Sequence, residues 1–143
     1  MKAWSRAPLP LQTAGIGLLV LGLLKLYAAA VPGMVPMTHD AVIPIPLRWL
    51  ALIMGLLEVQ FAVLIGFALH PLRGAQGMTL VGAGFIGYRW LHALAAGPSC
   101  PCLAGATSLL PILRRYEDNL LLALAVWFFL IGAWSWAMES KAT

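Results

Sequence analysis

Residues 11–31 read LQTAGIGLLVLGLLKLYAAAV, an apolar stretch interrupted by a single charge, Lys25. About 20 helical residues cross the hydrocarbon core of a bilayer, and this stretch has that length. Pro32 and Gly33 follow it and are expected to end the helix. The stretch is longer than the apolar core of a secretory signal and Lys25 interrupts it, so we expect a retained membrane span rather than a cleaved leader.

Three further stretches have the same character, at residues 49–69, 76–96 and 120–138. The whole chain is 62% hydrophobic and 10% charged, with a mean hydropathy of +0.89. Soluble domains carry roughly 25% charged residues. A chain this apolar cannot cover its surface with polar groups in water, whereas lipid solvates an apolar surface. The sequence therefore predicts an all-α polytopic membrane protein, a single domain over residues 1–143 built as a four-transmembrane-helix bundle.

The basic residues are scattered along the chain, so its net charge of +4 does not predict nucleic-acid binding. They bear instead on topology, because Lys and Arg are enriched on the cytoplasmic side. If the N-terminus is cytoplasmic, the inner side carries Lys2, Arg6, Arg73 and Lys141, and the outer side carries Arg48, Arg114 and Arg115. This slight excess predicts cytoplasmic termini in the inner (plasma) membrane, with the segment after the third helix outside.

Tryptophan and glycine support the four spans. Trp4, Trp134 and Trp136 fall near one predicted interface, and Trp49 and Trp90 fall near the other. Glycines on the first and third spans predict close helix contacts, namely Gly15, Gly22, Gly77, Gly82, Gly84 and Gly87. Trp127 lies in mid-span, where packing is the expected reason for it.

Ionisable residues inside a membrane are costly, so each needs a partner or a purpose. The predicted spans contain Lys25, Glu58, Arg89 and His92, all in the outer half of the bundle. One interpretation is an ion pair of Glu58 with Lys25 or Arg89 that holds helices together. The other is a polar intramembrane cluster in which one carboxylate serves two cations. The site would then stay positive and favour an anion, a thiolate or a quinone oxygen.

His92 follows Arg89 by three residues and Tyr88 by four, so all three can share a helical face. It is either a hydrogen-bonded packing residue or a proton-transfer group, since the usual pKa of histidine permits both. No Cys/His cluster has the spacing of a zinc site, so no metal is expected.

The sequence Gly97-Pro-Ser-Cys100-Pro-Cys102 follows the third span. A disulfide between residues this close in sequence closes a small, strained ring that is easily reduced. Nearby Arg89 and His92 would favour thiolate over thiol. The pattern favours a redox-active pair, with a passive surface pair or an intermolecular bridging site as alternatives.

The order of these features resembles the MauE/DoxX family of redox-associated membrane proteins. The resemblance covers about residues 14–133 and rests on four segments: Gly22-Leu-Leu-Lys25-Leu, Leu57-Glu58-Val59, Cys100-Pro-Cys102-Leu103 and the run from Arg114 to Leu121. Here Ala104 separates Leu103 from a glycine that in the family follows directly. The resemblance implies a four-helix membrane bundle with a redox role outside the cytoplasm, beside a thioredoxin-like partner.

Three hypotheses about function follow. The first is a membrane-embedded thiol–disulfide relay in which Cys100 and Cys102 exchange electrons with a thioredoxin-like or other periplasmic redox protein. His92 would assist, and the intramembrane cluster would tune the thiols or bind a quinone, the one cofactor considered. The second is a non-catalytic membrane-anchor or quinone-binding subunit of a redox complex. The third, a small-solute carrier, is disfavoured by four helices without a visible inverted repeat.

Overall fold

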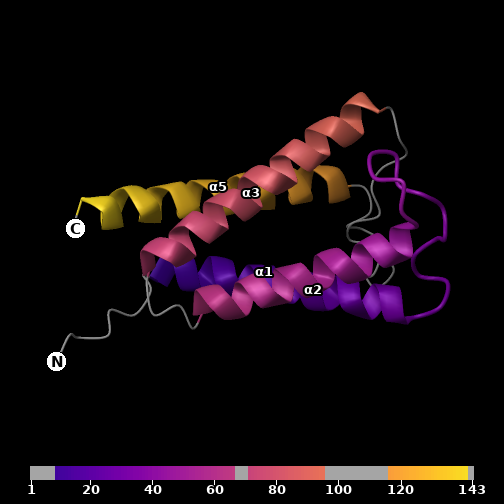
Figure 1. Ribbon diagram of the computed structural model, residues 1–143, viewed down its shortest axis with the longest axis horizontal. Coiled ribbons are helices and arrows are strands. Elements are labelled where there is room, and N and C mark those ends of the chain that lie inside the picture. Colours follow the sequence, from indigo (N-terminus) through magenta and orange to yellow (C-terminus); the bar gives the residue numbers. More distant parts are fainter. Residues whose placement is uncertain (1–8, 67–70, 96–115, 142–143) are drawn as a thin grey trace.

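The computed structural model describes residues 9–66, 71–95 and 116–141. It is all-helical in these ranges, apart from the segment between the first two helices. The four helices are α1 (Leu9–Ala30), α2 (Leu47–Gly66), α3 (Pro71–Leu94) and α5 (Glu117–Ser140). They run alternately up and down, so α1 begins and α5 ends at the same end of the bundle (Figure 1). We call the end where α1 begins and α5 ends the terminal end. The opposite end, which holds residues 31–46, is called the loop end.

The helix boundaries lie within three residues of those expected from the sequence, except at the start of α3. That helix begins at Pro71, five residues earlier than expected, and so includes Arg73. Proline is well suited to a first helical position, because the backbone N–H that it lacks has no partner there anyway. Pro71 therefore marks the start of α3. At the end of α1, Gly33 takes a positive φ of 85°, which turns the chain out of the helix.

The helices associate as two pairs, α1 with α2 and α3 with α5 (Figure 1). Glycines set the closeness of each pair. A Cβ added at Gly22 would lie 2.9 Å from the carbonyl oxygen of Gly55 on α2. One added at Gly82 would lie 2.4 Å from the backbone nitrogen of Phe129 on α5. The prediction of close contacts is confirmed for Gly22 and Gly82.

The other predicted packing glycines behave differently. A Cβ at Gly15 would make an ordinary contact, 3.4 Å from Ile65, and one at Gly77 would lie 4.0 Å from Phe61. Added Cβ atoms at Gly84 and Gly87 would meet nothing within 4 Å among the described residues. The prediction was therefore wrong for Gly84 and Gly87, because the helix positions they occupy do not face a neighbouring described helix closely.

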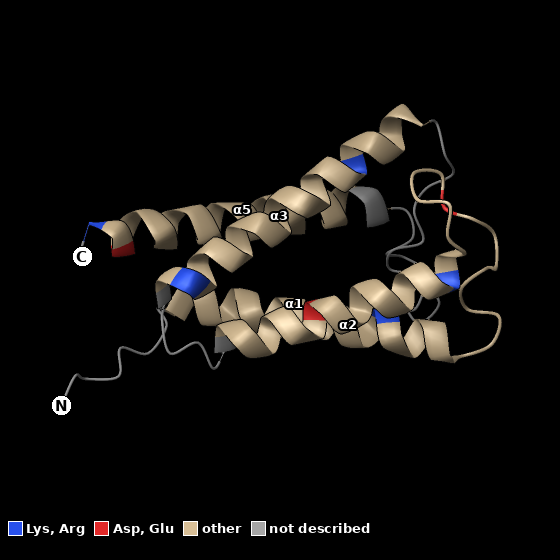
Figure 2. Ribbon diagram, in the orientation of Figure 1, with Lys and Arg blue, Asp and Glu red and all other residues tan. Residues whose placement is uncertain are grey.

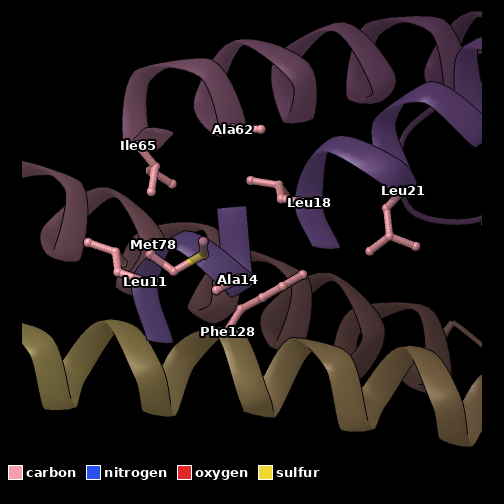
Figure 3. Packing of buried hydrophobic residues seen from close by; sticks show 8 residues of the cluster. All are labelled: Leu11, Ala14, Leu18, Leu21, Ala62, Ile65, Met78 and Phe128. Carbon is pink, nitrogen blue, oxygen red and sulfur yellow. The ribbon is translucent and has the colours of Figure 1, made fainter. Parts of the chain in front are cut away.

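The apolar core joins the two helix pairs in the half of the bundle nearer the terminal end. All four helices contribute to it (Figure 3). Its buried members are Leu11, Ala14, Leu18, Leu21, Ala62, Ile65, Met78 and Phe128. Toward the loop end α3 diverges from α1 and α2 (Figure 1), and this half contains the buried polar residues Lys25, Asp40 and His92.

The outward faces of the helices are largely apolar. Leu64, Leu80 and Leu130 are 64%, 72% and 58% exposed, and the charged residues lie mainly toward the helix ends (Figure 2). Helices α1, α2 and α5 are long and apolar enough to cross a membrane. Helix α3 is long enough to cross a membrane as well, but it is less apolar than the other three helices, because Arg73, Arg89 and other polar residues lie in it.

The tryptophans of the described residues lie as expected. Trp49 and Trp90 are exposed near the loop end, and Trp134 and Trp136 are exposed near the terminal end. Trp127 lies in the middle of α5, with its ring centroid 5.4 Å from that of Phe128, so packing accounts for it. Trp4 lies outside the described residues.

Candidate functional site

Lys25 and Glu58 form a buried ion pair between α1 and α2. The Lys25 ammonium donates a hydrogen bond to Glu58 Oε1, and the two side chains are only 9% and 2% exposed. The close approach of Gly22 and Gly55, one turn from these residues, brings the helices near enough for the pair. The sequence left Lys25 and Arg89 open as partners of Glu58, and the structure pairs Glu58 with Lys25. Paired burial removes most of the cost of placing each charge away from water.

Beyond their mutual hydrogen bond, the two residues differ in their contacts with the described residues: one Glu58 oxygen accepts no hydrogen bond, and Lys25 contacts a third helix. Glu58 Oε2 is buried and accepts no hydrogen bond from any residue that the structure describes. Lys25 Nζ lies 5.0 Å from the ring centroid of Phe85 on α3, a cation–π contact. Lys25 is therefore the charged group that connects α1 and α2 to α3.

A cavity of about 300 Å³ separates the two helix pairs in the loop half of the bundle. Its wall is mostly aliphatic and aromatic, and all four helices and the segment 31–46 contribute to it. The polar side chains among its lining are those of Lys25, Tyr88 and Arg89. The apolar lining is Leu21, Val35, Ile43, Leu47, Leu50, Ala51, Met54, Gly84, Phe85, Leu121, Leu124, Ala125 and Phe128. An apolar body with a few polar contacts suits such a pocket.

Asp40, in the segment between α1 and α2, organises the polar groups at the loop end. Asp40 is only 7% exposed. Oδ1 accepts hydrogen bonds from the backbone N–H groups of Val42 and Ile43, at 2.8 and 2.9 Å. Oδ2 accepts one from the Tyr88 hydroxyl at 2.6 Å. One carboxylate thus shapes its own loop and binds α3.

His92 completes this cluster. Its Nε2 lies 3.7 Å from Asp40 Oδ2, and its ring centroid lies 5.9 Å from that of Tyr88. Burial works to raise the pKa of Asp40. The hydrogen bonds from Tyr88, Ile43 and Val42, together with the nearby imidazole, outweigh burial and hold that pKa below its usual value. Asp40 is therefore a carboxylate at neutral pH.

The structure brings some of the predicted site residues together and separates others. Lys25 and Arg89 line the same cavity, and Glu58 lies behind Lys25 as its counter-ion. His92 belongs to the Asp40 cluster at the loop end. Cys100 and Cys102 lie outside the described residues.

Sequence reasoning missed Asp40, and this changes the charge of the site. Among the described residues, the cluster holds two cations, Lys25 and Arg89, and two carboxylates, Glu58 and Asp40. The hypothesis that one carboxylate serves two cations and leaves the site positive did not include Asp40, and it stays a prediction. The available signal was the rarity of acidic residues, since the chain has only five. An acid in a Pro-rich, otherwise apolar loop needs a partner as much as one in a helix does.

The described residues contain no group of three or more His, Cys, Asp or Glu side chains placed to hold a metal ion. The described lining of the cavity offers lysine, tyrosine and arginine donors on an apolar wall. Comparison of the chain with protein-family models, with characterised proteins and with solved structures finds no match.

Proposed function

We propose that this protein is a membrane-embedded redox protein that binds a quinone-class compound in the cavity between its helix pairs. The cavity is the observation that carries the proposal. Its volume, about 300 Å³, lies at the lower end of the range of small-molecule pockets, roughly 300–1,000 Å³. Its wall suits an apolar ring, and N–H donors come from α1 through Lys25 and from α3 through Arg89.

The balance of charge favours a neutral ligand over an anion. Glu58 neutralises Lys25 directly, and Asp40 places a carboxylate at the end of the cavity where Tyr88 and Arg89 lie. A free carboxylate or phosphate would therefore meet little net positive charge. A quinone is uncharged, has an apolar ring and accepts hydrogen bonds at its carbonyl oxygens, so it matches both the wall and the donors.

The membrane setting is part of the proposal. Four helices of 20 to 24 residues have the length of a bilayer core, and their outward faces carry exposed leucines that lipid would cover. Helix α3 would cross as the fourth span, with Arg73 near the terminal end and Arg89 turned to the cavity.

Labelling with a membrane-impermeant thiol reagent tests the orientation. We expect intact spheroplasts to react at Cys100 and Cys102 without permeabilisation, because the slight Lys/Arg excess puts the termini inside. The Cys100→Ser/Cys102→Ser variant is the control for reaction elsewhere. Labelling that requires a broken inner membrane would reverse the topology and remove the periplasmic setting.

Binding of a quinone is measured with a photoreactive azido-quinone on the purified full-length chain in lipid nanodiscs. We expect crosslinks in the cavity-lining parts of α1, α3 and α5. Arg89→Met should weaken binding about tenfold, since a hydrogen bond from a charged donor contributes roughly 1.5–3 kcal/mol. Lys141→Met, which removes an exposed cation outside the cavity, should leave binding unchanged.

Two results would contradict the quinone assignment. One is crosslinking that is equal in the Arg89→Met protein and the parent. The other is displacement of the probe by a long-chain fatty acid but not by excess unlabelled quinone, which would assign the cavity to an anion.

The proposal's redox step uses the two cysteines as the electron source. The thiols of Cys100 and Cys102 lose two protons and two electrons and form an S–S bond. The quinone takes up both and becomes the hydroquinone. Cys100 follows α3 in the sequence, five residues beyond Ala95. A thioredoxin-like partner would then reduce the disulfide while its own thiols are oxidised.

The double variant Cys100→Ser/Cys102→Ser separates this relay from a non-catalytic quinone-binding or anchor subunit. We expect it to bind quinone as the parent does, because the two donors assigned to the quinone, Lys25 and Arg89, are unchanged. It should form no hydroquinone when supplied with a reduced thioredoxin-like protein, measured by the loss of quinone absorbance. Unchanged turnover in that variant would exclude the relay and leave the binding subunit.

A further inference from the structure

The segment 31–46 is irregular but internally fixed. It has no helix, yet His39 and Pro46 form an antiparallel bridge. The N–H of Asp40 donates to the carbonyl oxygen of Ile45 at 3.1 Å, and the N–H of Leu47 donates to that of Thr38 at 2.9 Å. The segment is therefore held in part by backbone hydrogen bonds of its own.

This segment is also part of the cavity wall. Val35 and Ile43 line the cavity, and Val35 is only 5% exposed. The segment leaves α1 and returns to α2 at the loop end, where Figure 1 places it across the space between that pair and the end of α3. It thus covers the end of the cavity that faces away from the apolar core.

We propose that Asp40 is a positioning residue that holds the segment 31–46 closed over the cavity through its contacts with Tyr88 and His92. Within the segment, Asp40 Oδ1 binds the N–H groups of Val42 and Ile43. Across to α3, Oδ2 binds the Tyr88 hydroxyl and faces His92. A rigid loop carrying cavity residues is thereby fastened to the other helix pair at one carboxylate oxygen.

Closure has a direct consequence for the cavity ligand. While Asp40 holds Tyr88, the segment keeps Val35 and Ile43 in the wall and shields the cavity from the loop end. When the hydrogen bond opens, the segment can swing from α3 with its internal bonds intact. The ligand identity rests on the proposed quinone function, whereas the closure itself does not.

The test measures access to the cavity without any ligand. In a Cys100→Ser/Cys102→Ser background, Ala51→Cys places a reporter thiol on the cavity wall. Its rate of reaction with a water-soluble maleimide should rise about tenfold on adding Tyr88→Phe, the loss of one charge-assisted hydrogen bond. Asp40→Asn should give a similar rise, because an amide has one acceptor oxygen for the two sets of donors.

Matched controls separate closure from general loosening. Tyr27→Phe removes a phenol hydroxyl from an exposed side chain of α1 and should leave the rate unchanged. A second reporter, Ser135→Cys, replaces a buried residue of α5 that lies seven residues beyond Phe128, the last cavity residue of that helix. It should react equally slowly in all variants. If Tyr88→Phe raised the labelling rate at both reporters, or at neither, the proposal that Asp40 holds the segment 31–46 over the cavity would be wrong.

Addition of quinone distinguishes this inference from the proposed function. Protection of the Ala51→Cys thiol by quinone supports the ligand, whatever the effect of Tyr88→Phe. Faster labelling in Tyr88→Phe without any protection by quinone would keep the closure and overturn the quinone assignment. Protection by quinone without an effect of Tyr88→Phe or Asp40→Asn would keep the quinone assignment and overturn the closure by Asp40.

Discussion

Glu58→Leu should lower the free energy of unfolding by about 3–5 kcal/mol, the usual result of removing one partner from a buried ion pair. The side chain of Lys25 is 9% exposed, and its ammonium has Glu58 as its hydrogen-bonded counter-ion. Without that carboxylate, the buried lysine loses its counter-ion and keeps the weaker cation–π contact with Phe85. The measurement is unfolding of the purified chain by SDS titration in mixed micelles, followed by helical circular dichroism.

Removal of both partners distinguishes an uncompensated charge from lost packing. The double variant Lys25→Met/Glu58→Met should recover most of the stability, because no charge is left buried and the helix contact at Gly22 and Gly55 remains. Glu139→Leu, the same substitution near the end of α5, should change the stability little. A double variant less stable than Glu58→Leu would mean that the pair itself stabilises the bundle.

The helices and the ion pair could be predicted because each follows from local chemistry. Long apolar runs specify α1, α2 and α5 almost by themselves. A lone acid on an apolar span needs a cation, which narrowed the partners of Glu58 to Lys25 and Arg89, and the structure selects Lys25. The start of α3 was harder, since proline both ends and begins helices and only its neighbours decide which.

The rest of the site depends on contacts distant in sequence. Asp40 and Tyr88 are 48 residues apart, and no helical periodicity relates a loop carboxylate to a helix face. The cavity likewise arises from the divergence of α3 from α1 and α2, which helix spans do not encode. Among the glycines, Gly82 lies against the backbone of α5, whereas Gly87 has no described atom within 4 Å of an added Cβ. The sequence pattern alone does not distinguish these two glycines.

Those two glycines make opposite predictions for the same substitution. A Cβ at Gly82 would lie 2.4 Å from the nitrogen and 2.7 Å from the Cα of Phe129. These are backbone atoms of α5, so no side-chain rotation relieves the contact. The reciprocal approach occurs one turn along, where a Cβ at Gly132 would lie 2.5 Å from the backbone nitrogen of Thr79. Helices α3 and α5 are therefore held together at two points where each needs glycine.

Gly82→Ala should lower the free energy of unfolding by about 1–3 kcal/mol and Gly82→Leu by more, because α3 must move away from α5 to admit the side chain. Gly87→Ala should instead raise it by up to about 1 kcal/mol, since alanine favours the helix and meets nothing there. The same SDS titration measures both. Equal effects at the two positions would mean that the close approach of α3 to α5 does not exist in the folded protein.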